Sequence, residues 1–309
     1  MATILESGIQ SYFSYLDKKL PAAPQNMTLH DRRLRMEQVA AAAFVDGASS
    51  VTTQTWYVPV PGREIPIRIY RHGSGGTRPL VLFFHGGGWV SGSLDSHHFL
   101  ALALAESVDC SVVSVHYRRP PENPFPAPLD DCFEALRWAV SSAEFLQADP
   151  RRVALVGDSA GGHLAACCAI RARERGGLLL RSQALLYPMI EPNFTKASCR
   201  LFVDGPVLTM SDVKFYWQSL FGELVVDASA IPSHSDLVGL PATYVLTAEI
   251  DPLRDEGEAF AKGLTNAGVV VNLRRAKSVP HGFLRATAFS DTARHELALV
   301  CEALKSSLQ

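Results

Sequence analysis

Short apolar runs constrain the fold of this chain more than any other feature of its sequence. They contain few polar residues and do not alternate between polar and apolar positions. The runs lie at residues 80–84, 110–115, 153–156, 184–187, 243–246 and 269–273. Unalternated strands of this kind are buried on both faces, as they are in a parallel sheet that helices cover on either side.

Segments with helical character separate these apolar runs. The helices are predicted at residues 100–107, 132–140, 163–173, 257–267 and 292–304. Strands that alternate with helices indicate an α/β class with a mainly parallel central sheet flanked by helices. Ahead of the runs, the β-rich segments 52–58 and 65–70 surround a turn at 59–62 and predict an antiparallel pair. In such a sheet, functional residues gather on loops after the carboxyl ends of the strands.

Two segments do not follow the alternation of strand and helix. Residues 1–48 are predicted to be helical, and Thr28 and Asp31 have the spacing of a capping box at the start of a second helix that runs to Phe44. An aromatic-rich insertion at about 189–232 contains a helix that begins near Thr209 or Ser211. An insertion of this length between two strands is typical of a lid over a site.

The charge pattern argues against a polyanionic partner. The 309 residues include 29 lysines and arginines and 31 acids, and neither sign forms a long block. This pattern predicts no contact with nucleic acid or an anionic membrane. The cluster Asp31–Arg35 is interpreted as a solvated helix face. Because no secretory pattern and no apolar run of about 18 residues is found, we expect a cytoplasmic protein with a small, weakly charged partner.

The cysteines and histidines do not have the spacing of a metal site. The six cysteines form no Cys-x-x-Cys pair, and the ten histidines form no His-Glu-x-x-His motif. We expect buried free thiols, no metal and no other cofactor. The cysteines are Cys110, Cys132, Cys167, Cys168, Cys199 and Cys301.

The strongest local signal is a G-x-S-x-G motif that ends at Gly161, with Ser159 at its centre. It follows an apolar strand and opens a helix, as a nucleophile elbow requires. Glycine is needed at 157 and 161 because a side chain at either position would collide across the turn. The alternative interpretation is a glycine-rich turn that only starts a helix or binds a phosphate.

A second glycine loop, His85-Gly-Gly-Gly-Trp89, follows the apolar run 80–84. Its amides are not obstructed by β-carbons and can approach a reacting carbonyl. Together with the amide of Ala160 they would form an oxyanion hole, in which each donor typically lowers the barrier by about 2.7–4 kcal/mol. The alternative is a flexible surface turn, which would not account for the buried strand before it.

A serine nucleophile needs a base, and a histidine can titrate near neutral pH. His281 follows the last predicted strand and fits the chain order of nucleophile, acid and histidine. Asp251, after the run 243–246, is the preferred acid, with Glu249 and Asp255 as alternatives. Because Pro252 follows it, Asp251 also has the pattern of a helix N-cap, and the two roles are compatible.

The ordered motifs resemble the hormone-sensitive lipase family of α/β-hydrolases, in particular its bacterial esterases. The resemblance covers about residues 50–285 and includes Tyr117-Arg118 and the proline-rich stretch 121–128. It departs from the family at Arg119-Pro120 and at 276–279, which affects the expected substrate shape more than the chemistry. The resemblance implies the α/β-hydrolase fold, with a catalytic domain at 49–309 and a helical cap made from 1–48 and 189–232.

The resemblance also implies roles for individual residues. It predicts a triad of Ser159, Asp251 and His281. The oxyanion hole that it implies is made by the amides of Gly86, Gly87 and Ala160. The residues that it implies in supporting roles around the elbow and the glycine loop are His85, Gly88, Glu122 and Asp158. The substrate pocket is expected to include Trp89, Tyr187, Phe202, Trp217, Phe283 and Leu284.

The predicted function is hydrolysis of short-chain acyl esters by a serine carboxylesterase through an acyl-enzyme. The partner is then a small-molecule ester, and a homodimer is a further expectation from the resemblance. An amidase or formamidase with the same triad is one alternative. A ligand receptor that uses the same fold without turnover is the other.

Overall fold

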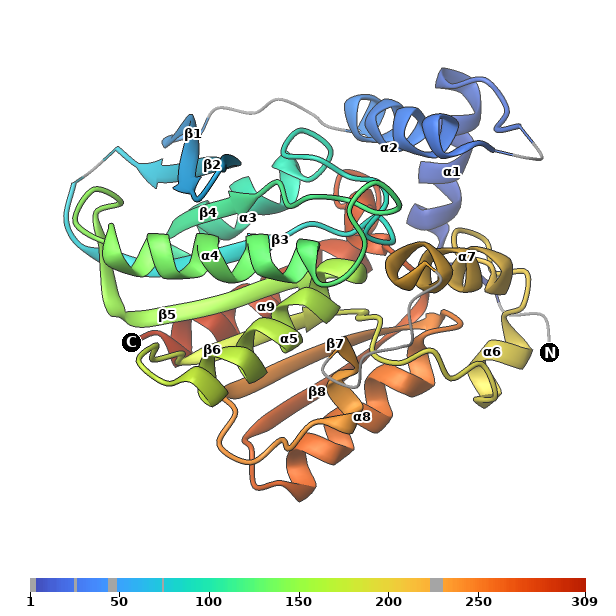
Figure 1. The fold of residues 1–309 in the computed structure, drawn as a ribbon. Coiled ribbons are helices and arrows are strands. Elements are labelled where there is room, and N and C mark those ends of the chain that lie inside the picture. Colours follow the sequence, from blue (N-terminus) through green and yellow to red (C-terminus); the bar gives the residue numbers. More distant parts are fainter. Residues whose placement is uncertain (1–3, 25–26, 44–48, 74, 223–229) are drawn as a thin grey trace.

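An eight-stranded sheet runs through the part of the chain that the computed structural model describes, which is residues 4–24, 27–43, 49–73, 75–222 and 230–309 (Figure 1). The strand order is β1-β2-β4-β3-β5-β6-β7-β8. The strands are β1 Val51–Val60, β2 Arg63–His72, β3 Arg78–Phe84, β4 Ser111–Val115, β5 Ala148–Asp158, β6 Ser182–Leu186, β7 Ala242–Ile250 and β8 Val271–Pro280. β2 pairs antiparallel with β1 and β4, and the other neighbouring pairs are parallel. The predicted mainly parallel sheet is confirmed.

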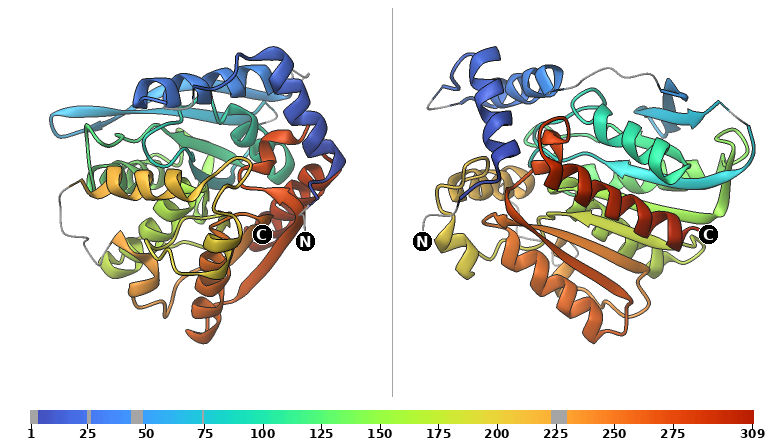
Figure 2. Two further views of the ribbon diagram at one scale, coloured as in Figure 1. Left: turned by 90° about the vertical axis from the view of Figure 1, so that its right-hand side faces the viewer. Right: turned by 180° about the vertical axis from the view of Figure 1, so that it is seen from behind.

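Helices cover both faces of the sheet. α4 (Ala127–Ser141), α5 (Ala160–Arg175) and α8 (Arg254–Asn266) lie on the face that Figure 1 shows in front. α3 (His98–Val108) and α9 (Asp291–Ser307) cover the opposite face, which Figure 2 shows from behind. These helices lie where the sequence predicted them.

The two layers explain why the central strands are apolar at every position. Along β3, Leu82 and Phe84 pack into one hydrophobic cluster, whereas Val81 and Phe83 pack into the cluster on the other face. All four side chains are fully buried. Since successive side chains of a strand point to opposite faces, a strand covered on both sides needs apolar residues throughout.

β8 is the exception among the apolar runs. It is the last strand in the sheet order and has β7 as its neighbour, so it forms an edge. Val270, just before it, is 76% exposed, and Leu273 is 45% exposed. The prediction of a strand buried on both faces at 269–273 is therefore wrong, because apolar composition does not distinguish an edge strand from a central one. The strand is also longer than predicted and ends at Pro280.

Four further helices lie together beyond the carboxyl ends of the parallel strands (Figures 1 and 2). They are α1 Ser7–Lys19, α2 Leu29–Ala43, α6 Ala197–Leu201 and α7 Met210–Phe221.

The predicted capping box at the start of α2 is present, since Thr28 Oγ1 accepts the Asp31 amide at 3.2 Å and Asp31 Oδ2 accepts the Thr28 amide at 2.9 Å. α7 begins after its N-cap Thr209, as predicted. Phe44, the boundary near residue 48 and residues 223–229 of the insertion lie outside the described residues.

The charged cluster at the start of α2 attaches this helix to its neighbours. Arg32 forms an ion pair with Asp212 of α7 at 2.7 Å, and Arg33 donates to the carbonyl of Val90 at 2.8 Å. Both arginines are partly buried. The interpretation of Asp31–Arg35 as a solvated face is therefore wrong, because the partners of these arginines come from distant parts of the sequence.

All six cysteines are buried and none is in a disulfide. In the part of the chain that the structure describes, no helix is long and apolar enough to cross a membrane.

The contrast between β3 and the β8 edge can be tested by two substitutions. Leu82→Ala should lower the free energy of unfolding by about 2–5 kcal/mol, because it leaves a cavity in a fully buried layer. Val270→Ala should change it by less than about 0.5 kcal/mol, because its side chain is largely exposed. Urea unfolding followed by circular dichroism measures both. Equal losses in the free energy of unfolding would contradict the assignment of β3 as a central strand and β8 as an edge strand.

Candidate active site

Ser159 occupies the sharp turn between β5 and α5. β5 ends at Asp158 and α5 begins at Ala160, so Ser159 joins them with a backbone φ of 56°. This φ is unfavourable for a residue with a side chain, and such strain is typical of functional positions. A β-carbon at Gly157 would collide with the carbonyl of Gly161, and one at Gly161 would collide with the carbonyl of Phe84. The elbow therefore has the steric requirement that the sequence indicated.

His281 connects Ser159 to Asp251 by hydrogen bonds. Its Nε2 lies 2.8 Å from Ser159 Oγ, and its Nδ1 lies 2.7 Å from Asp251 Oδ2. Ser159 follows β5, Asp251 follows β7 and His281 follows β8, so the three lie at the same, carboxyl edge of the parallel part of the sheet. Asp251 is fully buried. The structure thus places the three predicted residues in one hydrogen-bonded series.

Asp251 is held by the backbone ahead of α8. Its Oδ1 accepts the amide of Leu253 at 2.9 Å, which forms an Asx turn. α8 begins at Arg254, with Leu253 in the cap position. The prediction that Asp251 is the N-cap is therefore wrong by two residues, because Pro252 belongs to this turn. The turn nevertheless orients the carboxylate toward His281.

The two alternative acids have other partners. Glu249 Oε2 accepts the amide of Ser278 at 2.7 Å. Asp255 Oδ2 accepts the amide of Ser198 at 2.8 Å, and Asp255 also pairs with Arg254. Neither carboxylate is bonded to His281 in the described structure, which leaves Asp251 as the acid beside it.

The glycine loop after β3 lies beside Ser159. The amide of Gly86 donates to Asp158 Oδ1 at 2.8 Å and is therefore not available to a substrate. Gly87 and Gly88, in contrast, line the same cavity as Ser159. The prediction that Gly86 is an oxyanion donor is corrected accordingly, whereas Gly88, which the resemblance gave only a supporting role, lines the cavity. Sequence alone does not show which of three successive glycine amides the adjacent carboxylate binds.

Asp158 belongs to a buried polar network that the sequence did not reveal as a whole. His97 Nε2 lies 3.4 Å from Asp158 Oδ2, and Arg285 Nη2 lies 2.6 Å from the same histidine nitrogen. Burial alone would raise the pKa of Asp158, but His97, Arg285 and the Gly86 amide lower it to about 2. A negative charge is thus maintained directly behind the elbow. His97 and Arg285 carried no recognisable motif, because only the fold brings them to Asp158.

His85 begins the glycine loop and is fixed by its surroundings. Its carbonyl accepts the hydroxyl of Tyr117 at 2.7 Å, and the two rings stack with centroids 4.3 Å apart. A supporting role for His85 is consistent with these contacts.

Glu122 does not lie at the elbow or the glycine loop, contrary to its predicted supporting role. Its side chain is 52% exposed and pairs with Arg33 at 2.7 Å. Arg33 is the residue that reaches the loop, through the carbonyl of Val90. The motif that suggested Glu122 identifies its segment but not the contact that its side chain makes.

An apolar cavity of about 390 Å³ opens above Ser159 and His281. Side chains of α1, α2, α7 and the segment before α7 form much of its wall. They include Phe13, Leu16, Met36, Val39, Leu208 and Tyr216. A helical cap that includes α1 and α2 was predicted, but none of these six residues was among the predicted pocket residues.

Most of the predicted pocket residues lie elsewhere. Of the six, Phe283 lines the cavity. Trp89 packs against Trp217 with ring centroids 4.7 Å apart, inside one hydrophobic cluster. Tyr187 and Leu284 belong to the cluster on the other face of the sheet, although the Tyr187 ring also meets His281 edge-on at 5.1 Å. The remaining one, Phe202, lies beneath the guanidinium of Arg254.

Comparison with known proteins agrees with this architecture. Residues 81–285 match a family model described as the alpha/beta hydrolase fold. The chain therefore belongs to the α/β hydrolase fold family.

Relatives in this family define the enzyme class. The carboxylic ester hydrolase LipN of Mycobacterium tuberculosis is 41% identical over 237 residues, which cover 74% of this chain and 63% of LipN. An ethyl acetate hydrolase of Pseudomonas putida is 36% identical, with 80% of each chain covered. The crystal structure of a thermostable esterase from Pseudomonas putida has a TM-score of 0.93 at 30% identity and covers 100% of this chain and 99% of that chain. The predicted class, a carboxylic ester hydrolase, is confirmed.

The charge of Asp158 should make stability depend on pH. Because its pKa is lower in the folded protein than in the unfolded chain, its ionisation stabilises the fold above about pH 4, and this contribution is lost as the pH falls toward about 2. Asp158→Asn should lower the free energy of unfolding by about 1–3 kcal/mol near neutral pH. The difference from wild type should narrow toward about pH 3.

Urea unfolding at a series of pH values measures this difference. Asp204→Asn, at an exposed position, is the matched control and should leave stability nearly unchanged at every pH. If the loss in the free energy of unfolding of Asp158→Asn stayed constant between neutral and acidic pH, the stabilising role of the Asp158 charge would be contradicted.

Proposed function

We propose that the protein hydrolyses short-chain acyl esters through an acyl-enzyme on Ser159. The observation that carries this proposal is the hydrogen-bonded series from Asp251 through His281 to Ser159 at the base of an apolar cavity. His281 Nε2 takes the Ser159 proton as Oγ attacks the ester carbonyl. The same nitrogen then protonates the departing alcohol. Asp251 stays ionised and keeps the proton of the neutral imidazole on Nδ1.

Deacylation uses the same groups with water as the nucleophile. His281 removes a proton from water as its oxygen attacks the acyl carbon, and the proton returns to Ser159 Oγ when the carboxylic acid leaves. Serine, base and acid are thereby regenerated.

The amides of Gly87, Gly88 and Ala160 are the proposed oxyanion donors. Gly87 and Gly88 line the cavity beside Ser159. Ala160 is the first residue of α5, so its amide has no acceptor within the helix and lies at the positive end of the helix dipole. Each such donor typically lowers the barrier by about 2.7–4 kcal/mol.

Cavity size supports a small substrate. About 390 Å³ is near the lower end of the volumes that proteins use for small ligands. The relationship to an ethyl acetate hydrolase supports the same choice, since the name of that relative specifies a two-carbon acyl group.

We also propose that residues 1–48 and 189–232 form the cap of a catalytic domain at 49–309. Side chains from α1, α2 and the 206–216 region line the cavity over Ser159, which supports this division. A homodimer and a cytoplasmic location stay predictions.

The mechanism can be tested with 4-nitrophenyl acetate. Ser159→Ala and Asp251→Asn should each lower kcat by at least about a thousandfold, because the first removes the nucleophile and the second allows the wrong tautomer of His281. Ser141→Ala, an exposed serine on α4, is the control and should retain full activity. Undiminished turnover by Ser159→Ala would reject the mechanism.

A series of 4-nitrophenyl esters of increasing acyl length, with matching anilides, tests the substrate class. We expect the highest kcat/KM for the short esters and slower cleavage of every anilide. Faster anilide cleavage would favour an amidase. Stoichiometric binding without turnover would indicate a ligand receptor.

A further inference from the structure

Tyr12 of α1 has a buried hydroxyl without a partner. The side chain is 5% exposed, and within the described structure its oxygen makes no hydrogen bond. Burying a hydroxyl without a hydrogen-bond partner is unfavourable, so a position of this kind suggests a missing partner. Tyr15, on the same helix, is different, since its hydroxyl donates to the carbonyl of Ala42 at 3.1 Å.

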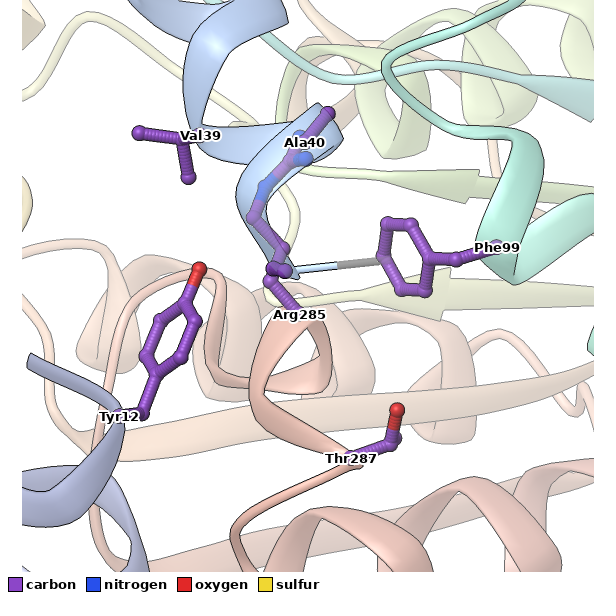
Figure 3. Close-up of a pocket in the computed structure, with 7 residues that line it drawn as sticks. Tyr12, Val39, Ala40, Phe99, Arg285 and Thr287 are labelled. Carbon is purple, nitrogen blue, oxygen red and sulfur yellow. The ribbon is translucent and has the colours of Figure 1, made fainter. Parts of the chain in front are cut away.

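Tyr12 faces a small cavity of about 30 Å³ under α2. Figure 3 shows its hydroxyl pointing toward the side chain of Arg285, with Val39 and Ala40 of α2 above them and Phe99 opposite. A space of this size can hold one water or one polar group of a ligand.

The small cavity adjoins the large one above Ser159. Tyr12, Val39 and Arg285 line both of them. A substrate whose ester group lies at Ser159 can therefore place another of its groups against Tyr12 and Arg285.

Arg285 brings a positive charge to this junction. Its Nη1 donates to the carbonyl of Ser96 at 3.0 Å, and its Nη2 lies 2.6 Å from His97 Nε2. In the described part of the chain, Arg285 forms no ion pair with a carboxylate. Asp158 lies on the other side of His97, and its carboxylate accepts the Gly86 amide.

Most of the charged side chains on the wall of the large cavity are also positive. Its described lining contains three arginines and one carboxylate, Asp158. Arg32 forms an ion pair with Asp212, whereas Arg35 donates a hydrogen bond to the carbonyl of Pro21. The lining of this apolar cavity therefore holds more basic than acidic side chains.

We infer that the preferred substrates are esters with a carboxylate or similar anionic oxygen remote from the scissile bond, bound by Tyr12 and Arg285. This inference rests on the proposed ester hydrolysis and names the class of substrate. An anion enters an apolar cavity only if charge-assisted hydrogen bonds replace its hydration. Arg285 supplies the opposite charge, and the Tyr12 hydroxyl supplies a donor with no other partner.

The protonation of Tyr12 fits this role. Burial raises the pKa of its phenol, and Arg285 opposes this rise only in part. The hydroxyl therefore remains a donor at neutral pH.

Matched pairs of esters test the inference in two arms. The first compares 4-nitrophenyl monoesters of dicarboxylic acids with 4-nitrophenyl esters of fatty acids of equal length, which places the anion on the acyl side. The second compares acetates of hydroxycarboxylic acids with acetates of simple alcohols, which places it on the alcohol side. In one arm, the wild type should prefer the anionic ester by about tenfold or more in kcat/KM at the best chain length.

Tyr12→Phe is the decisive variant, because it removes only the unpaired hydroxyl. The ratio of kcat/KM for the anionic ester to that for the neutral ester should fall by about tenfold. Tyr15→Phe removes a hydroxyl from the same helix outside both cavities and should leave this ratio unchanged.

The outcomes separate this inference from the proposed function. Failure of the wild type to hydrolyse any ester, neutral or anionic, would reject the proposed function itself. Hydrolysis of neutral esters without a preference for the anionic ester in either arm would overturn the substrate class alone. An equal loss on both members of a pair in Tyr12→Phe would show that the hydroxyl acts only on structure and would also overturn it.

Discussion

The hydrogen bond from the Gly86 amide to the Asp158 carboxylate is the contact on which the arrangement of the site depends. β3 and β5 are parallel neighbours, with Phe84 opposite Gly157, so the glycine loop and the elbow leave the sheet side by side. A single buried carboxylate then joins them at 2.8 Å. This bond occupies the first loop amide, and the next two residues, Gly87 and Gly88, line the cavity. One interaction thus aligns the nucleophile with the proposed oxyanion donors.

Features that depend on local chain geometry could be predicted from the sequence. The elbow requires glycine at 157 and 161 because backbone atoms of the turn and of β3 leave no room for a β-carbon. His281 was identifiable because it follows the last strand of an ordered series. The central strands were identifiable because both of their faces are buried. In each case the physical constraint acts on neighbouring residues, or on a single strand, and therefore marks the sequence itself.

Features that depend on which distant groups meet could not be predicted in the same way. Arg32 looked like a surface residue because its partner, Asp212, lies 180 residues away along the chain. Trp89 and Trp217 had the composition expected of a pocket, yet they fill the core together with His163. Burial favours aromatic residues in a core and in a cavity wall alike. Composition therefore cannot decide between these locations before the helices are placed.

The segment after β8 connects the chemistry to the cavity wall. His281 is hydrogen-bonded to Ser159, Phe283 lines the cavity, and Arg285 contacts both His97 and the space beside Tyr12. Arg285 thus acts on Asp158 behind the elbow and also lines the cavity beside Tyr12. A substitution of Arg285 would disturb both places, because one guanidinium serves them. The Tyr12 hydroxyl has no partner behind the elbow, so charge recognition can be separated from alignment of the nucleophile at that position.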